Sequence, residues 1–174
     1  MPLSRAVFFD RDGVLTRERH DYVKTPEELE ILPGIETSLR EVQKRGFRIV
    51  IITNQSVVGR GLTTHYEMSR IHDKLRAELA RLGCEIDGIY YCPHRPDEGC
   101  DCRKPAPGLI LKAAKELGID IAESWMIGDK EMDLEAARRA GCHGIRVPTN
   151  GNGLVEAVHT IVLAENGSKE DETS

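Results

Sequence analysis

Two carboxylates, Asp10 and Asp12, lie two residues apart directly after the apolar run Ala6–Phe9. The run has the length and composition of a short buried strand, and ligands bind at the carboxyl ends of the strands in a parallel sheet. Because side chains alternate along an extended backbone, both carboxylates face one side of it. Two close negative charges repel unless a cation or a shared proton lies between them. The pair therefore predicts a divalent metal site with a nucleophile and a proton donor beside it.

Polar groups also follow the second predicted strand, residues 48–53. Thr53, Asn54, Gln55 and Ser56 bring hydroxyls and exposed backbone N–H groups to the end of that strand. Such groups suit a phosphate oxygen, although threonine and asparagine after a strand often serve only to form a turn. These four residues are therefore candidates for phosphate binding.

Two cations and a further aspartate occupy corresponding positions later in the chain. Arg103 and Lys104 precede the helix-like stretch Gly108–Leu117. The lysine could neutralise phosphate as a point charge and the arginine could grip a second oxyanion, although both could also be solvated surface cations. Asp129 follows another strand-like run and could complete the metal site that begins at Asp10, because Mg²⁺ prefers one or two carboxylates, waters and phosphate. A helix N-cap is the alternative for this aspartate.

A loop between the third strand and the next helix carries four potential metal ligands, Cys92, His94, Cys100 and Cys102. Three thiolates and one imidazole suit tetrahedral Zn²⁺, and a full set of protein ligands leaves no position for a reacting water. The loop has little apolar surface to bury, so a metal would supply the stabilisation it lacks. We expect a structural zinc site over residues 92–102, with unliganded cysteines as the alternative.

The elements that must position these residues alternate along the chain. Strands are predicted at Ala6–Phe9, 48–53, Gly88–Cys92, 124–127, 144–147 and, less distinctly, 159–163; helices are predicted at 35–45, 64–82, Gly108–Leu117 and Glu131–Ala140. Strands that alternate with helices predict an α/β fold with a doubly wound parallel sheet. We expect one domain over residues 1–165 and a polar, disordered tail over residues 166–174.

Composition excludes several classes of protein. The chain has 174 residues, of which 40% are hydrophobic and 30% charged, and a net charge of −5, which argues against a nucleic-acid partner. No apolar run approaches the ~20 residues that span a bilayer, and the first ten residues lack the pattern of a secretory signal. We therefore expect a cytoplasmic protein whose cysteines are thiols or metal ligands.

The order of these motifs resembles the haloacid dehalogenase superfamily of aspartate-nucleophile phosphatases, in which an acid pair, a hydroxyl, a lysine and an acid each follow a strand. The resemblance covers roughly residues 6–147. It implies a Rossmann-like fold, Mg²⁺ dependence and an aspartyl-phosphate intermediate. Only about ten residues separate Asp12 from Tyr22, so we expect a minimal cap beside the zinc loop. The Cys-Pro-His and Cys-x-Cys-Arg-Lys-Pro segments resemble the branch with heptose bisphosphate and histidinol-phosphate phosphatases.

The resemblance also implies a role for individual residues. Asp10 would be the nucleophile and Asp12 the general acid and base. The Mg²⁺ ligands would be the Asp10 side chain, the Asp12 backbone carbonyl and Asp129, while Thr53 and Lys104 would hold the transferring phosphoryl oxygens. Contacts to the rest of the substrate are implied for Arg19, His20, Asp21, Tyr22, Asn54, Gln55, Ser56, Arg103 and Lys130.

The implied partner is a small phosphorylated sugar. We expect removal of the 7-phosphate of D-glycero-D-manno-heptose 1,7-bisphosphate, because Arg103, Lys104 and Lys130 are more cations than one phosphate requires. Histidinol phosphate is the alternative substrate, which the six-residue step from His94 to Cys100 favours. A non-catalytic phosphate-binding or interaction module is the alternative of another class. We expect a monomer that acts without nucleic acid or membrane.

Overall fold

The computed structural model describes residues 2–171, and within them five parallel strands form one open sheet in the order β3-β2-β1-β4-β5. The strands are β1 (Ala6–Phe9), β2 (Arg48–Asn54), β3 (Gly88–Cys92), β4 (Trp125–Gly128) and β5 (His143–Arg146). The helices are η1 (Pro26–Glu28, a 3₁₀ turn), α1 (Ile35–Lys44), α2 (Ser56–Gly59), α3 (His65–Arg81), α4 (Gly108–Leu117), α5 (Glu131–Ala140) and α6 (Leu154–Asp171).

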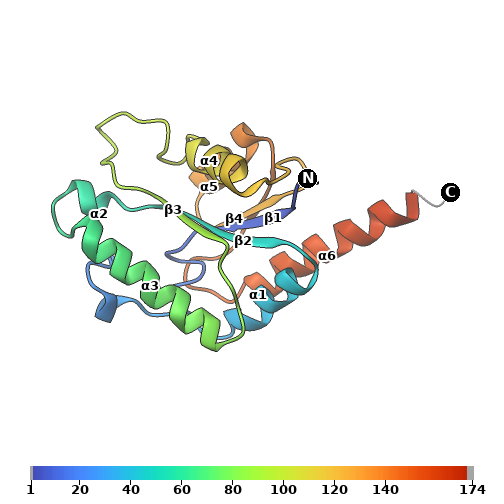
Figure 1. Cartoon of the computed structure of the whole chain (residues 1–174), viewed down its shortest axis with the longest axis horizontal. Helices are drawn as coiled ribbons and strands as arrows, with labels where there is room; N and C mark the ends of the chain where they lie inside the picture. The colour runs from blue at the N-terminus through green and yellow to red at the C-terminus, as the bar shows by residue number, and fades with distance from the viewer. Residues whose placement is uncertain (1, 172–174) are drawn as a thin grey trace.

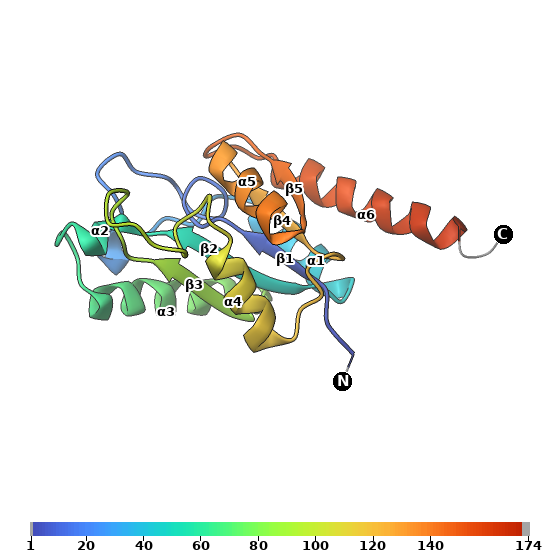
Figure 2. The ribbon, with the colours of Figure 1, turned by 90° about the horizontal axis from the view of Figure 1, so that it is seen from above.

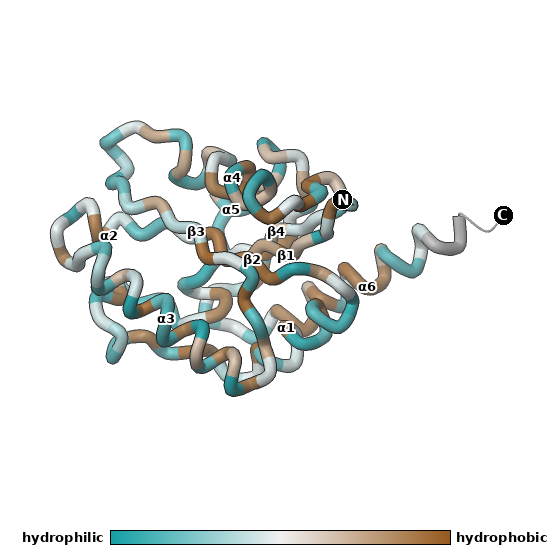
Figure 3. The backbone as a smooth tube through the Cα atoms, in the orientation of Figure 1, coloured by the Kyte–Doolittle hydropathy of each residue, from teal (hydrophilic) through white to brown (hydrophobic). Residues whose placement is uncertain are grey.

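Helices cover both faces of the sheet. Figure 1 shows α4 and α5 on one face and α1, α3 and α6 on the other. Alternate residues of β1 face the two layers: Val7 and Phe9 pack with α1 and α3, whereas Ala6 and Phe8 pack with α4 and α5. In Figure 3 the central strands are coloured hydrophobic between helices of mixed colouring, as expected of a parallel sheet buried on both faces. The predicted doubly wound fold is confirmed.

The strand order places the functional residues together at the carboxyl ends of the strands. The chain runs outward from β1 through β2 to β3, then returns across the sheet to β4 and β5 on the other side. The loops that follow β1 and β3 gather at the end opposite the start of β1 (Figure 2). The direction of winding reverses between β1 and β4, which is where ligands bind in open α/β sheets. Asp10 follows β1 and Asp129 follows β4, so both lie at that position.

The cap is minimal, as predicted. Within the described residues, the segment between β1 and α1 carries only the short η1 turn, and the segment between β3 and α4 carries no helix or strand. None of the described helices combines the length and apolar character needed to cross a bilayer.

Two predictions about the C-terminal part were wrong. Residues 159–163, expected as a strand, lie within α6, where Ala157, Val158 and Ile161 are buried at helical spacing beside α1. A short apolar run cannot by itself distinguish a strand from one face of a helix. The expected disordered tail is also helical as far as Asp171, while residues 172–174 lie outside the described part of the chain. An ion pair between Glu165 and Arg5, at 2.7 Å, holds α6 against the rest of the chain directly before residue 166.

Candidate active site

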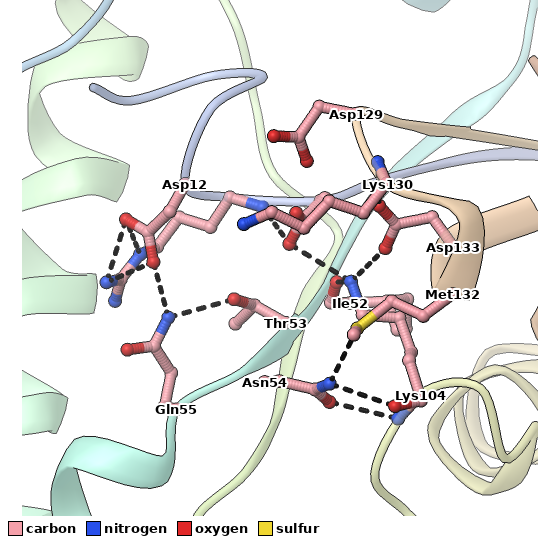
Figure 4. Close-up of polar contacts among 12 residues, drawn as sticks. Asp12, Ile52, Thr53, Asn54, Gln55, Lys104, Asp129, Lys130, Met132 and Asp133 are labelled. Atoms are coloured by element: carbon pink, nitrogen blue, oxygen red, sulfur yellow. Dashed lines mark hydrogen bonds and ion pairs between the residues drawn. The ribbon is translucent and has the colours of Figure 1, made fainter. Parts of the chain in front are cut away.

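A cavity of about 220 Å³ opens at the carboxyl edge of the sheet. The predicted site residues that line it are Asp10, Asp12, Arg19, Tyr22, Thr53, Asn54, Gln55, Ser56, Arg103, Lys104 and Lys130, and Glu18, Val23, Arg60, Met132 and Asp133 complete the lining. Figure 4 shows the central side chains pointing toward one another from separate loops. His20 and Asp21 are exposed and do not line the cavity. Asp129 is buried beside Asp10.

Lys104 lies at the centre of the site and is only 2% exposed. Its Nζ donates to Asp10 Oδ1 at 3.0 Å and to the Ile52 carbonyl at 2.8 Å, and lies 2.6 Å from Asp133 Oδ1 (Figure 4). Burial opposes the charge of Lys104, but Asp10 and Asp133 outweigh it and raise the pKa of the ammonium. Lys104 therefore remains a cation between two carboxylates, positioned to meet an anionic ligand.

Asn54 holds the Lys104 backbone in place. The Asn54 amide donates to the Lys104 carbonyl at 3.1 Å and accepts from the Lys104 N–H at 3.0 Å. Asn54 thereby mimics a strand neighbour and couples the end of β2 to the loop before α4. Its predicted role was contact with substrate, whereas its visible role is to orient the lysine.

Asp10 lies in a strongly negative environment. Burial, together with the charges of Asp133, Asp12 and Asp129, raises its pKa to about 7 despite the opposing effect of Lys104. The Arg11 backbone N–H donates to Asp10 Oδ1 at 2.8 Å. Negative charge is therefore crowded here, which is the condition that a bound cation relieves.

The donor set fits Mg²⁺. Carboxylate oxygens of Asp10, Asp129 and Asp133 lie within 4.8 Å of one another. Asp129 accepts from Thr149 Oγ1 at 2.7 Å through Oδ2, whereas its buried Oδ1 has no hydrogen-bond partner. A buried acceptor without a partner is costly, and a hard cation would satisfy it. The Asp12 side chain does not join this cluster, so a contribution from its backbone carbonyl stays a prediction.

Gly13 lets two loops meet at the cluster. Its φ of +89° is left-handed, and a Cβ built there would lie 2.5 Å from Asp129 Oδ2. A side chain at this position would push Asp129 away from Asp10, in addition to the backbone strain. The absence of a side chain after the acid pair is therefore required on steric grounds.

Asp12 is held on three sides. The Arg11 guanidinium contacts both of its carboxylate oxygens, with Nη2 to Oδ2 at 2.9 Å. Gln55 Nε2 donates to Oδ2 at 2.7 Å, and Thr16 Oγ1 donates to Oδ1 at 3.2 Å. Gln55 also donates to Thr53 Oγ1 at 2.9 Å, so one amide links the acid to the hydroxyl at the end of β2.

Asp133 and Thr149 also belong to the site, although neither is among the predicted site residues. The Asp133 carboxylate accepts from the Lys130 backbone N–H at 3.0 Å, which is half of a capping box, and also faces Lys104. A Cβ on Gly128 would lie 2.2 Å from the Asp133 Cβ, so this glycine admits the aspartate. The Gly-Asp-x-x-x-Asp spacing of residues 128–133 carried a signal for Asp133, whereas no local pattern marks Thr149.

Cations surround the outer part of the cavity. Lys130 forms an ion pair with Glu18, and Arg19 pairs with Asp21 at 3.0 Å. The Arg60 guanidinium lies 5.8 Å from the centre of the Tyr22 ring. Arg103 Nη1 donates to the His94 carbonyl at 3.4 Å, which connects the cavity wall to the cysteine loop. The outer cavity therefore suits an anionic or hydroxylated ligand.

The four predicted zinc ligands converge in the loop after β3. Ligand atoms of Cys92, His94, Cys100 and Cys102 all lie within 4.8 Å of one another, with Cys92 Sγ 3.7 Å from Cys100 Sγ and 3.2 Å between His94 Nδ1 and Cys102 Sγ. Tetrahedral ligands at about 2.3 Å from a metal would be separated by about 3.8 Å. All five cysteines are free thiols. The cluster therefore suits a metal rather than a disulfide.

Comparison with known proteins identifies a family. The model of the haloacid dehalogenase-like hydrolases matches residues 17–141. A D-glycero-beta-D-manno-heptose-1,7-bisphosphate 7-phosphatase of Yersinia pestis is 41% identical over 142 residues, which cover 78% of this chain and 75% of the relative. The corresponding protein of Bordetella bronchiseptica is 40% identical over 149 residues, which cover 86% and 83%.

Solved structures agree with that match. The D,D-heptose 1,7-bisphosphate phosphatase of B. bronchiseptica, crystallised with magnesium and phosphate, superposes with a TM-score of 0.79 at 38% identity and covers 88% of this chain and 86% of that one. A haloacid dehalogenase-like phosphatase of Mesorhizobium loti has a TM-score of 0.77 at 24% identity over 92% and 88% of the two chains, and supports the fold alone.

Proposed function

Because the chain belongs to the haloacid dehalogenase-like hydrolase family, we propose that it is a Mg²⁺-dependent phosphatase that removes the 7-phosphate of D-glycero-D-manno-heptose 1,7-bisphosphate. The names of the relatives support this substrate. The observation that carries the proposal is the buried Lys104 between Asp10 and Asp133, at the base of a cavity with further cations on its wall.

The first half of the reaction forms an acyl phosphate. A carboxylate oxygen of Asp10 attacks the phosphorus, and the bond between phosphorus and the sugar oxygen breaks. Asp12 gives its proton to the leaving sugar oxygen, so the alcohol departs neutral. Lys104 and Thr53 hold the transferring phosphoryl oxygens while charge spreads over them.

The second half regenerates the enzyme. Asp12, now ionised, takes a proton from water, whose oxygen attacks the same phosphorus. The bond between phosphorus and Asp10 breaks and inorganic phosphate leaves. The side chains of Asp10 and Asp129 and the Asp12 carbonyl would hold Mg²⁺, which supplies neutralisation of the phosphate and of the Asp10 charge.

The outer cavity would bind the rest of the substrate. Arg103, Arg60 and Lys130 line it and are more exposed to solvent than Lys104. We assign the phosphate that is not hydrolysed to Arg103 and Arg60, because arginine forks bind phosphate bidentately. Arg19 and Tyr22 would contact sugar hydroxyls. We assign no substrate contact to His20 and Asp21, because neither lines the cavity.

We further assign the Cys92–His94–Cys100–Cys102 cluster to structural Zn²⁺, because three thiolates and an imidazole fill a tetrahedron. Reduced thiol ligands favour a reducing compartment, so we propose a cytoplasmic enzyme. We also propose a monomer as the active unit, since Asp10, Asp12, Lys104 and Asp129 all belong to one chain.

The test compares heptose 1,7-bisphosphate with histidinol phosphate in the presence of Mg²⁺. We expect a higher kcat/KM for the bisphosphate by at least about 100-fold, because each lost charged hydrogen bond costs about 1.5–3 kcal/mol. Asp10→Asn should abolish turnover of both. A higher kcat/KM for histidinol phosphate would overturn the substrate assignment, and undiminished turnover by Asp10→Asn would overturn the nucleophile.

A further inference from the structure

Arg11 is the one residue between the two aspartates of the acid pair, and its residue exposure is 0%. Arginine is almost never fully buried unless it is paired, because its charge loses hydration. It occupies space between the site and α3, where an apolar side chain would pack without that cost. The groups that contact the Arg11 guanidinium must therefore compensate for the cost of burying its charge.

One edge of the Arg11 guanidinium is occupied by Asp12. Nε donates to Oδ1 at 3.1 Å, and Nη2 donates to Oδ1 at 3.0 Å and to Oδ2 at 2.9 Å. These contacts fix the plane of the carboxylate as well as its position. The Asp12 side chain remains 23% exposed, and it lines the cavity, so the hold leaves it accessible to a ligand.

The other edge is held by α3. Nη1 lies 3.2 Å from His72 Nε2 and 3.5 Å from Met68 Sδ. Since guanidinium only donates, the imidazole nitrogen must accept. His72 is 7% exposed and packs edge-on against Tyr91 with ring centres 5.5 Å apart. Burial, together with the charges of Arg11 and Arg76, lowers the pKa of His72 to about 3, so the ring is neutral and can accept at neutral pH.

We propose that Arg11, seated on His72, is a positioning residue that aims the Asp12 carboxylate at the leaving group. The inference rests on the proposed phosphatase activity and extends it to a helix outside the cavity. Thr16 and Gln55 supply only one donor to each carboxylate oxygen, and the Thr16 contact is long, at 3.2 Å. The guanidinium fork adds three contacts to the same two oxygens, and α3 keeps the fork in place.

Leaving groups of different basicity separate this role from a merely structural one. An alkoxide departs from a sugar phosphate only with a proton from Asp12, whereas p-nitrophenolate departs without one. kcat/KM reports events up to phosphoryl transfer to Asp10 and is therefore the quantity to compare. His72→Leu removes the acceptor for Arg11, and His72→Gln is the matched control because its amide oxygen can accept.

We expect His72→Leu to lower kcat/KM for heptose bisphosphate at least about 10-fold and that for p-nitrophenyl phosphate less than about 3-fold. His72→Gln should stay within about 2-fold of wild type for both esters. Arg11→Lys, which keeps the charge and loses the fork, should repeat the selective loss if His72→Leu fails to fold. Thermal unfolding of each variant identifies misfolded material.

Equal losses for the two esters, or no loss in either His72→Leu or Arg11→Lys, would overturn the positioning role. Turnover by the wild type separates a failure of the proposed phosphatase activity from a failure of the positioning role alone. If the wild type hydrolyses neither ester with Mg²⁺, the proposed phosphatase fails and this inference fails with it. If the wild type is active and the ratio between esters is unchanged in the variants, only the role of Arg11 and His72 is wrong.

Discussion

Gly13 shows how one missing side chain shapes the site. It combines a φ of +89° with the close approach to Asp129 Oδ2, whereas Gly34 has a φ of +80° and open space where its Cβ would be. The two glycines therefore share the backbone requirement and differ in what surrounds them. Alanine at either position pays the left-handed cost of about 1–2 kcal/mol, but only at Gly13 does it meet a metal-site carboxylate.

We expect Gly13→Ala to raise the Mg²⁺ concentration for half-maximal activity at least about 10-fold, because it displaces Asp129. Both variants should lower the midpoint of thermal unfolding, because both strain the backbone, but Gly34→Ala should leave the Mg²⁺ dependence unchanged. Magnesium titrations of the two variants measure this difference. Equal Mg²⁺ dependence in both would show that the close approach is irrelevant to the metal.

His72 carries a stability that depends on pH. Its pKa is lowered from 6.5 to about 3 in the folded protein, first by burial and then by the charges of Arg11 and Arg76. Below pH 6.5 the unfolded chain therefore binds a proton that the folded chain does not, and folding loses stability as the pH falls toward 3. Where the unfolded chain binds one proton more than the folded chain, the free energy of unfolding falls by about 1.4 kcal/mol per pH unit.

His72→Gln tests this dependence because glutamine does not titrate. Between pH 7 and pH 5 we expect the wild type to lose about 2 kcal/mol more free energy of unfolding than the variant. Urea unfolding at several pH values measures the difference, and the acidic residues common to both proteins cancel. Parallel stability curves for the two proteins would contradict a neutral His72 in the fold.

At the scale of an element, the loop after β3 depends on its ligands. Residues between Cys92 and Cys102 form no helix or strand, and Cys100 and Cys102 are only half-buried. Burial favours a higher pKa for Cys100, but the backbone N–H of Arg103 and the neighbouring thiols lower it to about 7. A thiol that ionises readily beside three other ligands is suited to metal binding. Arg103 and Lys104 follow directly, so the loop positions two residues of the cavity.

We expect Cys102→Ser to remove zinc from the purified protein and to lower both the thermal midpoint and kcat/KM. Cys142→Ser, which changes a buried thiol outside the cluster, is the control for loss of a cysteine and should retain zinc. Elemental analysis and thermal unfolding of the two variants give the comparison. Wild-type protein that contains no zinc and is unaffected by Cys102→Ser would contradict the assignment.

Three elements of the fold supply the groups that contact Lys104. The end of β2 supplies Asn54 and the Ile52 carbonyl, β1 leads to Asp10, and the first turn of α5 supplies Asp133. The lysine is thus fixed by groups from three elements that meet only when the sheet has formed. A buried charge held in this way is strongly positioned and expensive to leave unpaired.

At the scale of the whole molecule, the site joins both halves of the sheet. Asp10 and Asp129 come from β1 and β4, between which the winding of the chain reverses. A ligand that bridges them bonds to the folded state and not to the unfolded chain, so it stabilises the entire fold. Binding at 100 times the dissociation constant adds about 2.7 kcal/mol.

We expect Mg²⁺ together with inorganic phosphate, at about 100 times their dissociation constant, to raise the thermal midpoint of the wild type by about 5–11 °C for a chain of this size. Asp129→Asn should abolish the shift, whereas Glu123→Gln, at an exposed position before β4, should retain it. Differential scanning fluorimetry measures both. A shift that persists in Asp129→Asn would place the metal elsewhere.

The sequence by itself determined the order and type of the main elements and the family. Apolar runs alternate with amphipathic stretches at Ala6–Phe9 and Glu131–Ala140, and chemistry-bearing residues follow directly after strands. Both signals are local, because side-chain periodicity and strand ends are properties of a few neighbouring residues. The resemblance to haloacid dehalogenases rests on those local motifs and is confirmed by the family match.

Only the tertiary structure decided which residues meet. The strand order brings Thr149 to Asp129, and α3 brings His72 to Arg11, across 20 and 61 positions of the chain. It also made residues 159–163 helical, because they pack against α1 rather than at the edge of the sheet. Contacts between distant segments depend on how whole layers pack, and no local pattern of hydrophobicity encodes that choice.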